Sequence, residues 1–249
     1  MGNQETGTIF EESVVQHLNG YTFKNLSEIY KSLIKKVFPD IKETSLIKSG
    51  AIRGFMKPDI FIEAEGKIKN ISLKTGTARV IHQERVQTFI GFLRSKGISD
   101  ETLKTILLMH FSDGTLNGTG PRRYSFDKMK YTLEERIKKA NDELNANKYF
   151  IKDFIDHCMF IGVMENPVIA DFVYHGEDEF GYAVSREKML EYAKNMNWDY
   201  YNNLHIGPLF FRCHARYLDK PIKNEKSRMK VDVWWPNLLV HICNASKLK

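Results

Sequence analysis

Two short strands joined by a tight turn are the strongest structural signal in the chain. Asp59–Ala64 is rich in Ile and Phe, which is typical of a buried strand, and Glu65-Gly66 supplies residues suited to a turn. Apolar and polar residues then alternate along Lys67–Lys74. Because successive side chains of a strand point to opposite faces, Ser72 and Lys74 share one face. The pattern predicts a β-hairpin.

The ends of this hairpin carry residues that can perform chemistry. Asp59 opens the first strand and Lys74 closes the second. Neighbouring strands lie about 5 Å apart, so the correct register brings both side chains to one place. Phosphodiester hydrolysis needs carboxylates that hold a hard cation and a positive group beside the attacking water. The pair therefore indicates either a metal-dependent nuclease site or a surface hairpin with charged ends.

A helix is expected before the hairpin. Thr8–Leu18 has apolar residues every four positions, with Glu11 and Glu12 between them. Taken alone, a Glu on such a helix is more often part of a solvated face than a ligand.

The motif Pro58-Asp59 followed by Ser72-Leu73-Lys74 resembles that of the PD-(D/E)xK nuclease superfamily, especially type II restriction endonucleases that cut short palindromes. The resemblance covers roughly the first 115 residues. It implies Mg²⁺ as the cofactor, with Mn²⁺ able to substitute. It also implies a metal site formed by Asp59, the main-chain carbonyl of Leu73 and a Glu from an early helix, for which Glu11 is the better match and Glu12 the alternative. It also implies that Lys74 positions the water. The family usually has an acid or its amide where this chain has Ser72, which puts full activity in doubt.

The resemblance further implies a double-stranded DNA substrate, and several basic or polar residues are candidates to contact it. Arginine and glutamine can bind phosphate or the edges of guanine and adenine. The candidates are Arg53, Lys57, Thr75, Arg79, Gln83, Arg85, Arg122, Arg123, Lys226 and Arg228. The last two belong to the basic run Lys220–Lys230, which could equally be a solvated loop.

The remaining pattern indicates an α/β fold with a central mixed sheet flanked by helices, as in restriction endonucleases, and a mixed C-terminal half. We expect helices at Ser27–Val37, at about Val80–Ser95 and within Tyr131–Leu144, and a helix or strand at Leu103–Phe111. Short strands separated by turns are expected from Asp171 to Ile242. Residues 1–145 would form the catalytic core. Residues 146–249 would complete that core and contact DNA, and the two parts could be one domain.

Composition is consistent with a nucleic-acid partner. Lys and Arg outnumber Asp and Glu by 37 to 31, which gives a net charge of +6. The three cysteines form no CxxC pair, so we expect no zinc cluster and a reducing, cytoplasmic location. No apolar run has membrane length and no nucleotide-binding glycine motif is present, so neither a membrane nor a nucleotide cofactor is expected.

A palindromic site would favour a homodimer, although some related nucleases act as monomers. Two other functions stay open. One is a repair, transposition or junction-resolving nuclease of the same fold, and the other is a catalytically inactive DNA-binding protein.

Overall fold

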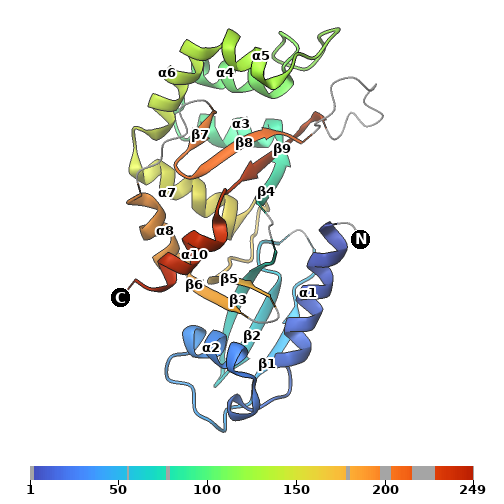
Figure 1. Cartoon of the computed structure of the whole chain (residues 1–249), viewed down its shortest axis with the longest axis vertical. Coiled ribbons are helices and arrows are strands. Elements are labelled where there is room, and N and C mark those ends of the chain that lie inside the picture. Colours follow the sequence, from blue (N-terminus) through green and yellow to red (C-terminus); the bar gives the residue numbers. More distant parts are fainter. Residues whose placement is uncertain are drawn as a thin grey trace. The chain divides into compact units, whose positions relative to one another are not determined.

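The computed structural model describes residues 3–54, 56–76, 79–177, 180–196, 203–214 and 228–248 (Figure 1). The chain divides into two compact units. The first comprises Met1–Arg79, Asp156–Tyr192 and Asn237–Lys249, and the second comprises Val80–Ile155 and Ala193–Pro236. Each unit therefore combines segments that are distant in the sequence, rather than dividing at a single point near residue 145.

A five-stranded mixed sheet forms the centre of the first unit, with strand order β1-β2-β3-β5-β6. The strands are β1 (Lys48–Ala51), β2 (Ile60–Ala64), β3 (Lys67–Lys74), β5 (Phe172–Gly176) and β6 (Gly181–Ser185). Only β3 and β5 pair in parallel, and the other pairs are antiparallel. The predicted α/β class, the mixed sheet and the β2–β3 hairpin are confirmed.

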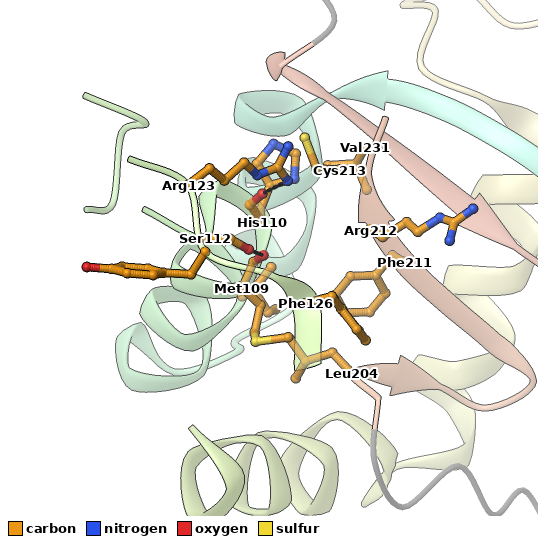
Figure 2. Close-up of a pocket in the computed structure, with 12 residues that line it drawn as sticks. Met109, His110, Ser112, Arg123, Phe126, Leu204, Phe211, Arg212, Cys213 and Val231 are labelled. Atoms are coloured by element: carbon orange, nitrogen blue, oxygen red, sulfur yellow. Dashed lines mark hydrogen bonds between the residues drawn. The ribbon is translucent and has the colours of Figure 1, made fainter. Parts of the chain in front are cut away.

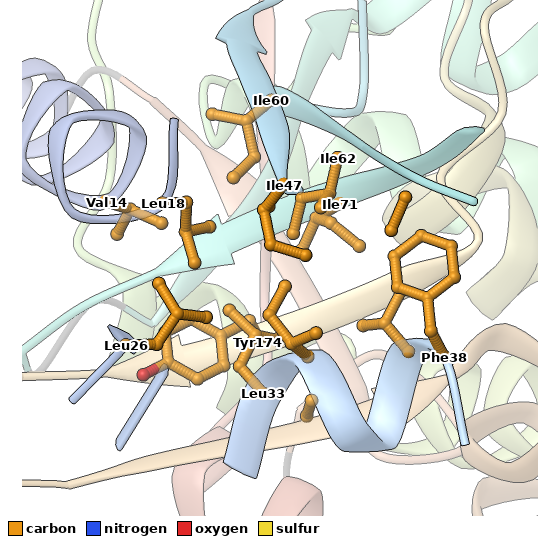
Figure 3. Close-up of a cluster of buried hydrophobic side chains, with 14 of the residues drawn as sticks. Val14, Leu18, Leu26, Leu33, Phe38, Ile47, Ile60, Ile62, Ile71 and Tyr174 are labelled. Atoms are coloured by element: carbon orange, nitrogen blue, oxygen red, sulfur yellow. The ribbon is translucent and has the colours of Figure 1, made fainter. Parts of the chain in front are cut away.

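One face of this sheet packs against two helices, α1 (Asn3–Leu18) and α2 (Glu28–Val37), with the single 3₁₀ turn η1 (Phe23–Asn25) between them. The core contains side chains from all of these elements, including Val14, Leu33, Ile60, Ile62 and Ile71, as Figure 3 shows. The alternation of the hairpin buries Ile60 and Ile62 completely. Each such side chain contributes about 1.5–3 kcal/mol of burial free energy, which fixes the strand register.

Helices also occur where the sequence suggested only strands and turns. These helices are α8 (Arg186–Lys194), most of which belongs to the first unit, and α10 (Leu238–Ser246), which packs on β6 and β5. The first unit also contains the π-helical turn η2 (His157–Ile161). The expectation of strands alone between residues 171 and 242 was wrong. The run Leu-Leu-Val at the start of α10 looks strand-like, but its buried residues recur at helical spacing: Leu238, His241, Ile242 and Ala245.

The second unit contains an antiparallel sheet of order β4-β9-β8-β7. Its strands are β4 (Val80–Arg85), β7 (His205–Ile206), β8 (Leu209–Cys213) and β9 (Lys230–Trp234). Its helices are α3 (Val86–Ser95), α4 (Asp100–Phe111), α5 (Phe126–Thr132), α6 (Glu134–Asn145) and α7 (Lys148–Asp156). Phe89 joins α3 to this core, because its ring contacts Phe154 at 5.9 Å and Phe211 at 5.0 Å between centroids.

The helix expected from about Val80 begins instead at Val86. Residues 80–85 pair with β9, which lies far along the chain, and the Val86 amide donates to the Met229 carbonyl at 2.8 Å. This long-range pairing overrides the local helical pattern. Leu103–Phe111 is helical, and its helix begins at a Ser99 cap whose side chain accepts from the Thr102 amide.

The described residues contain no disulfide bond. All three cysteines are free thiols, and Cys158 and Cys213 are buried. Among the described residues no helix has the length and apolar character needed to cross a bilayer.

Candidate active site

The backbone of the hairpin fixes the position of Asp59. Ile60 pairs with Ile71 in the β2–β3 register. The Asp59 amide donates to the Ile71 carbonyl at 2.9 Å, and the Asp59 carbonyl accepts from the Ile52 amide at 2.8 Å. Asp59 is thus held from both sides, one position before β2, next to Ser72 on β3.

The predicted hairpin residues meet in one cluster. Asp59 Oδ2 accepts from the Leu73 amide at 2.6 Å and from Ser72 Oγ at 3.3 Å. Lys74 Nζ donates to Ser72 Oγ at 2.9 Å and to the Leu73 carbonyl at 2.8 Å. The same ammonium lies 3.9 Å from Asp59 Oδ2. The structure therefore brings Asp59, Ser72, Leu73 and Lys74 together as the sequence predicted.

Helix α1 brings Glu11 to this cluster. Partial burial raises the pKa of the Glu11 carboxyl, the negative charge of Asp59 raises it further, and the positive charges of Lys74 and Arg53 oppose this. Glu12, by contrast, is exposed, and its Oε1 lies 3.9 Å from Arg53. The structure favours Glu11 over Glu12 as the helical carboxylate of the site.

The chemistry of these donors fits a hard divalent cation. The carboxylate of Asp59 lies close enough to Glu11 to disfavour the charged form of Glu11. Within the described residues, Glu11 makes no hydrogen bond or ion pair, and the bonds to Asp59 all reach Oδ2. Carboxylate oxygens and a main-chain carbonyl are the ligands that Mg²⁺ and Mn²⁺ prefer. Ser72 is only 1% exposed and adds a neutral oxygen in place of a third acid.

Replacing Glu11 by Gln is expected to raise the free energy of unfolding of the metal-free protein by less than about 1 kcal/mol, because solvent screens this partly exposed carboxylate. The amide keeps the side-chain shape and carries no charge beside Asp59. The gain is present where the wild-type carboxylate is ionised, and it shrinks as pH falls through the raised pKa of Glu11. Chemical denaturation in chelator at about pH 7 and about pH 4 measures it. Glu12→Gln is the matched control, and an equal gain in both variants would contradict the assignment.

His175 is a neighbour of the site that the sequence did not indicate. It lies opposite Lys74 in the parallel β3–β5 pairing and is 1% exposed. Burial lowers the pKa of His175, against a backbone hydrogen bond to Gly76, and the charge of Lys74 lowers it further. Among the described residues its Nδ1 has no hydrogen-bond partner. No local motif marks His175, because only the pairing of distant strands places it beside Lys74.

The other predicted DNA contacts of the first unit differ in their surroundings. Arg53 and Arg79 are exposed, and Thr75 is half-buried directly after Lys74. Lys57 is half-buried, and its ammonium donates to the Cys158 carbonyl. Lys57 therefore has a structural partner, whereas the two arginines present their side chains to solvent.

The remaining predicted contacts belong to the second unit. Gln83 and Arg85 are exposed on β4, and Arg122 is exposed after the glycine-rich loop. Arg228 is ion-paired with the buried Asp113, and Arg123 donates to the His110 carbonyl at 3.0 Å. The last candidate, Lys226, lies outside the described residues.

A cavity of about 210 Å³ lies within the second unit, beside α4 and β8 (Figure 2). Its lining combines aromatic and apolar side chains with His110 and Arg123. The His110 Nε2 bonds the Arg228 carbonyl at 2.9 Å, and burial lowers the pKa of His110 to about 4. His110 is therefore neutral near pH 7.

We expect this histidine to make the protein sensitive to mild acid. As pH falls from about 6.5 towards 4, the unfolded chain gains a proton at His110 that the folded protein excludes. The free energy of unfolding should drop by on the order of 3 kcal/mol from this group. Urea denaturation across that range measures the drop, and His110→Gln should make the profile flatter. An unchanged slope in the variant would show that His110 is not the titrating group.

The chain was also compared with known proteins. No protein-family model matches it, and no curated protein is similar to it in sequence. The resemblance to PD-(D/E)xK nucleases therefore depends on the motif residues and their geometry.

Proposed function

We propose that the protein is a metal-dependent endonuclease that hydrolyses phosphodiester bonds of double-stranded DNA. The observation that carries the proposal is the cluster at the hairpin end, where Asp59, Lys74 and the α1 residue Glu11 converge. Lys74 Nζ is 3.9 Å from Asp59 Oδ2, and the pKa of Glu11 responds to both groups. An acid pair can hold a divalent cation, and a fixed ammonium can offset charge on the phosphate, so together they supply two of the groups that assist this hydrolysis.

Each residue has a distinct role in the proposal. Asp59 and Glu11 would hold the cation with help from the Leu73 carbonyl. When bound there, Mg²⁺ would neutralise phosphate charge and lower the pKa of a bound water. Hydrogen bonds to Ser72 Oγ and the Leu73 carbonyl hold the Lys74 ammonium in one position, close to Asp59. There it orients the attacking water and offsets the charge that develops on the phosphate. Ser72 links Lys74 to Asp59 through its hydroxyl.

The finer proposal is a type II restriction enzyme with a restriction-endonuclease-like fold. It is supported by the mixed sheet, which places Asp59, directly before β2, near Lys74 on the adjacent strand β3, with a helical Glu beside them. Sequence-specific cutting at a palindrome, a homodimer and a cytoplasmic location belong to this proposal. The exposed Arg85 is a residue type able to read base edges.

Digestion of phage-sized DNA by the purified protein tests the function. Discrete fragments that require Mg²⁺ and vanish with chelator are the expected result, and sequencing their ends gives the site. A Mg²⁺-dependent smear of fragments would support a nuclease but contradict a sequence-specific restriction enzyme. Branched DNA of the kind formed in repair or transposition would then be the next substrate to test. Intact DNA with every divalent metal would contradict the proposal.

Ser72 supports a second candidate, a DNA-binding protein without catalysis. A buried serine supplies a weaker metal ligand than the acid usual at this position. Tight binding of duplex DNA without cleavage by the folded protein would favour this candidate.

A further inference from the structure

One face of the second unit's sheet carries a group of positive and planar side chains. Antiparallel partners share a face, and Gln83 pairs with Asp232, Arg85 with Lys230, and Arg212 with Asp232. We call the group formed by Gln83, Arg85, Arg212, Lys230 and Trp234 the basic face. The opposite side of the strands carries Phe211 and Val233, which are buried.

Aromatic stacking holds one cation of the basic face. The Arg212 guanidinium lies 3.9 Å from the Trp234 ring centroid, and Phe210 stacks on Trp234 at 5.9 Å. Figure 2 shows the Arg212 guanidinium directed away from His110 and Arg123.

A hydrogen-bond network orders the neighbouring polar groups. Lys230 Nζ donates to Gln83 Oε1 at 2.9 Å, and Gln83 Nε2 donates to Asp232 Oδ1 at 2.8 Å. His214 Nδ1 lies 3.0 Å from the same carboxylate. The Asp232 side chain is only 3% exposed, so its negative charge is largely covered. Arg85 is exposed, and within the described residues it has no ion-pair partner.

We infer that the basic face is a contact surface for the phosphate backbone of duplex DNA. This inference rests on the proposed function and identifies where the second unit would bind its substrate. Arg85, Arg212 and Lys230 place three positive charges on one face, where the single carboxylate of Asp232 is largely covered. This excess of positive charge complements a row of phosphates. A second copy of this chain is disfavoured as the occupant, because a two-fold contact would place the same cations against each other.

Binding of a labelled random-sequence duplex, measured by fluorescence anisotropy in chelator, tests the inference without cleavage. Arg85→Ala and Arg212→Ala should each weaken binding by about tenfold at low salt and lower the salt slope by about one. Arg94→Ala is the matched control, since Arg94 is an exposed arginine of the same unit that pairs with Asp100. It should bind like the wild type. Thermal unfolding of each variant verifies the fold.

The outcomes separate this inference from the proposed function. If both variants bind DNA with the affinity and salt slope of the wild type, the basic face is not the DNA contact surface. Mg²⁺-dependent cleavage would still support the nuclease. If the variants lose DNA binding and the wild type never cleaves DNA, the basic face is supported as a DNA contact surface and the proposed nuclease function is contradicted. If polyglutamate competes as well as duplex, or the wild type does not bind duplex, the face serves another partner and the inference fails.

Discussion

Asp59→Asn is expected to lower DNA cleavage by on the order of 10³-fold or more, because it removes an anionic metal ligand whose effect is worth several kcal/mol. The amide keeps an oxygen that can accept from the Leu73 amide and Ser72, which now bond Oδ2. The strand pairing and the DNA affinity in chelator should therefore persist. End-labelled duplex cleavage under single-turnover conditions measures the rate.

Asp171→Asn is the matched control for this change. Asp171 also accepts a backbone amide of β3, from Asn70 at 2.9 Å, and it lies 3.3 Å from Lys69 Nζ. It takes no part in the proposed cation site, so cleavage should stay within a few-fold of the wild type. Equal losses in the two variants would mean that Asp59 acts through the fold of the hairpin.

Lys74→Met should lower cleavage by about 10²–10⁴-fold while leaving metal binding in place. Methionine retains the length of the side chain and removes the charge that lies near Asp59 and Glu11. Lys74→Arg should restore little, because a planar guanidinium does not reproduce a point charge held by Ser72 Oγ and the Leu73 carbonyl.

Lys69→Met supplies the comparison for the lysine. Lys69 lies on the same strand and pairs with Asp171 at 3.3 Å. Its loss should leave the cleavage rate unchanged. A Lys74→Met enzyme that retains full activity would remove Lys74 from the mechanism, whatever the behaviour of Asp59.

The hairpin could be predicted from sequence because its information is local. Alternation along β3 placed Ser72 and Lys74 on one face, and burial of Ile60 and Ile62 set the register. Glu11 was predictable as a helical residue. Its choice over Glu12 required the structure, because only the packing of α1 decides which carboxylate approaches Asp59.

Features that depend on distant pairing could not be predicted in the same way. The strand β4 forms because residues 80–85 pair with β9, and His175 reaches Lys74 because β5 pairs with β3. The partner of Arg228 is likewise remote, since Asp113 lies on a separate loop. In the sequence Arg228 was one cation of a basic run. Arg85 and Arg212 are far apart in the sequence, and only the pairing of the strands shows that they lie on the same face of the sheet.

The central claim is that Asp59 and Glu11 share one divalent cation, and Mn²⁺ binding measured by electron paramagnetic resonance tests it most directly. The wild type and Lys74→Met should bind Mn²⁺ at one site, and Asp59→Asn should bind it at least about tenfold more weakly. Mn²⁺ binding by Asp59→Asn that equals the wild type, or no binding by the wild type at millimolar Mn²⁺, would contradict the account.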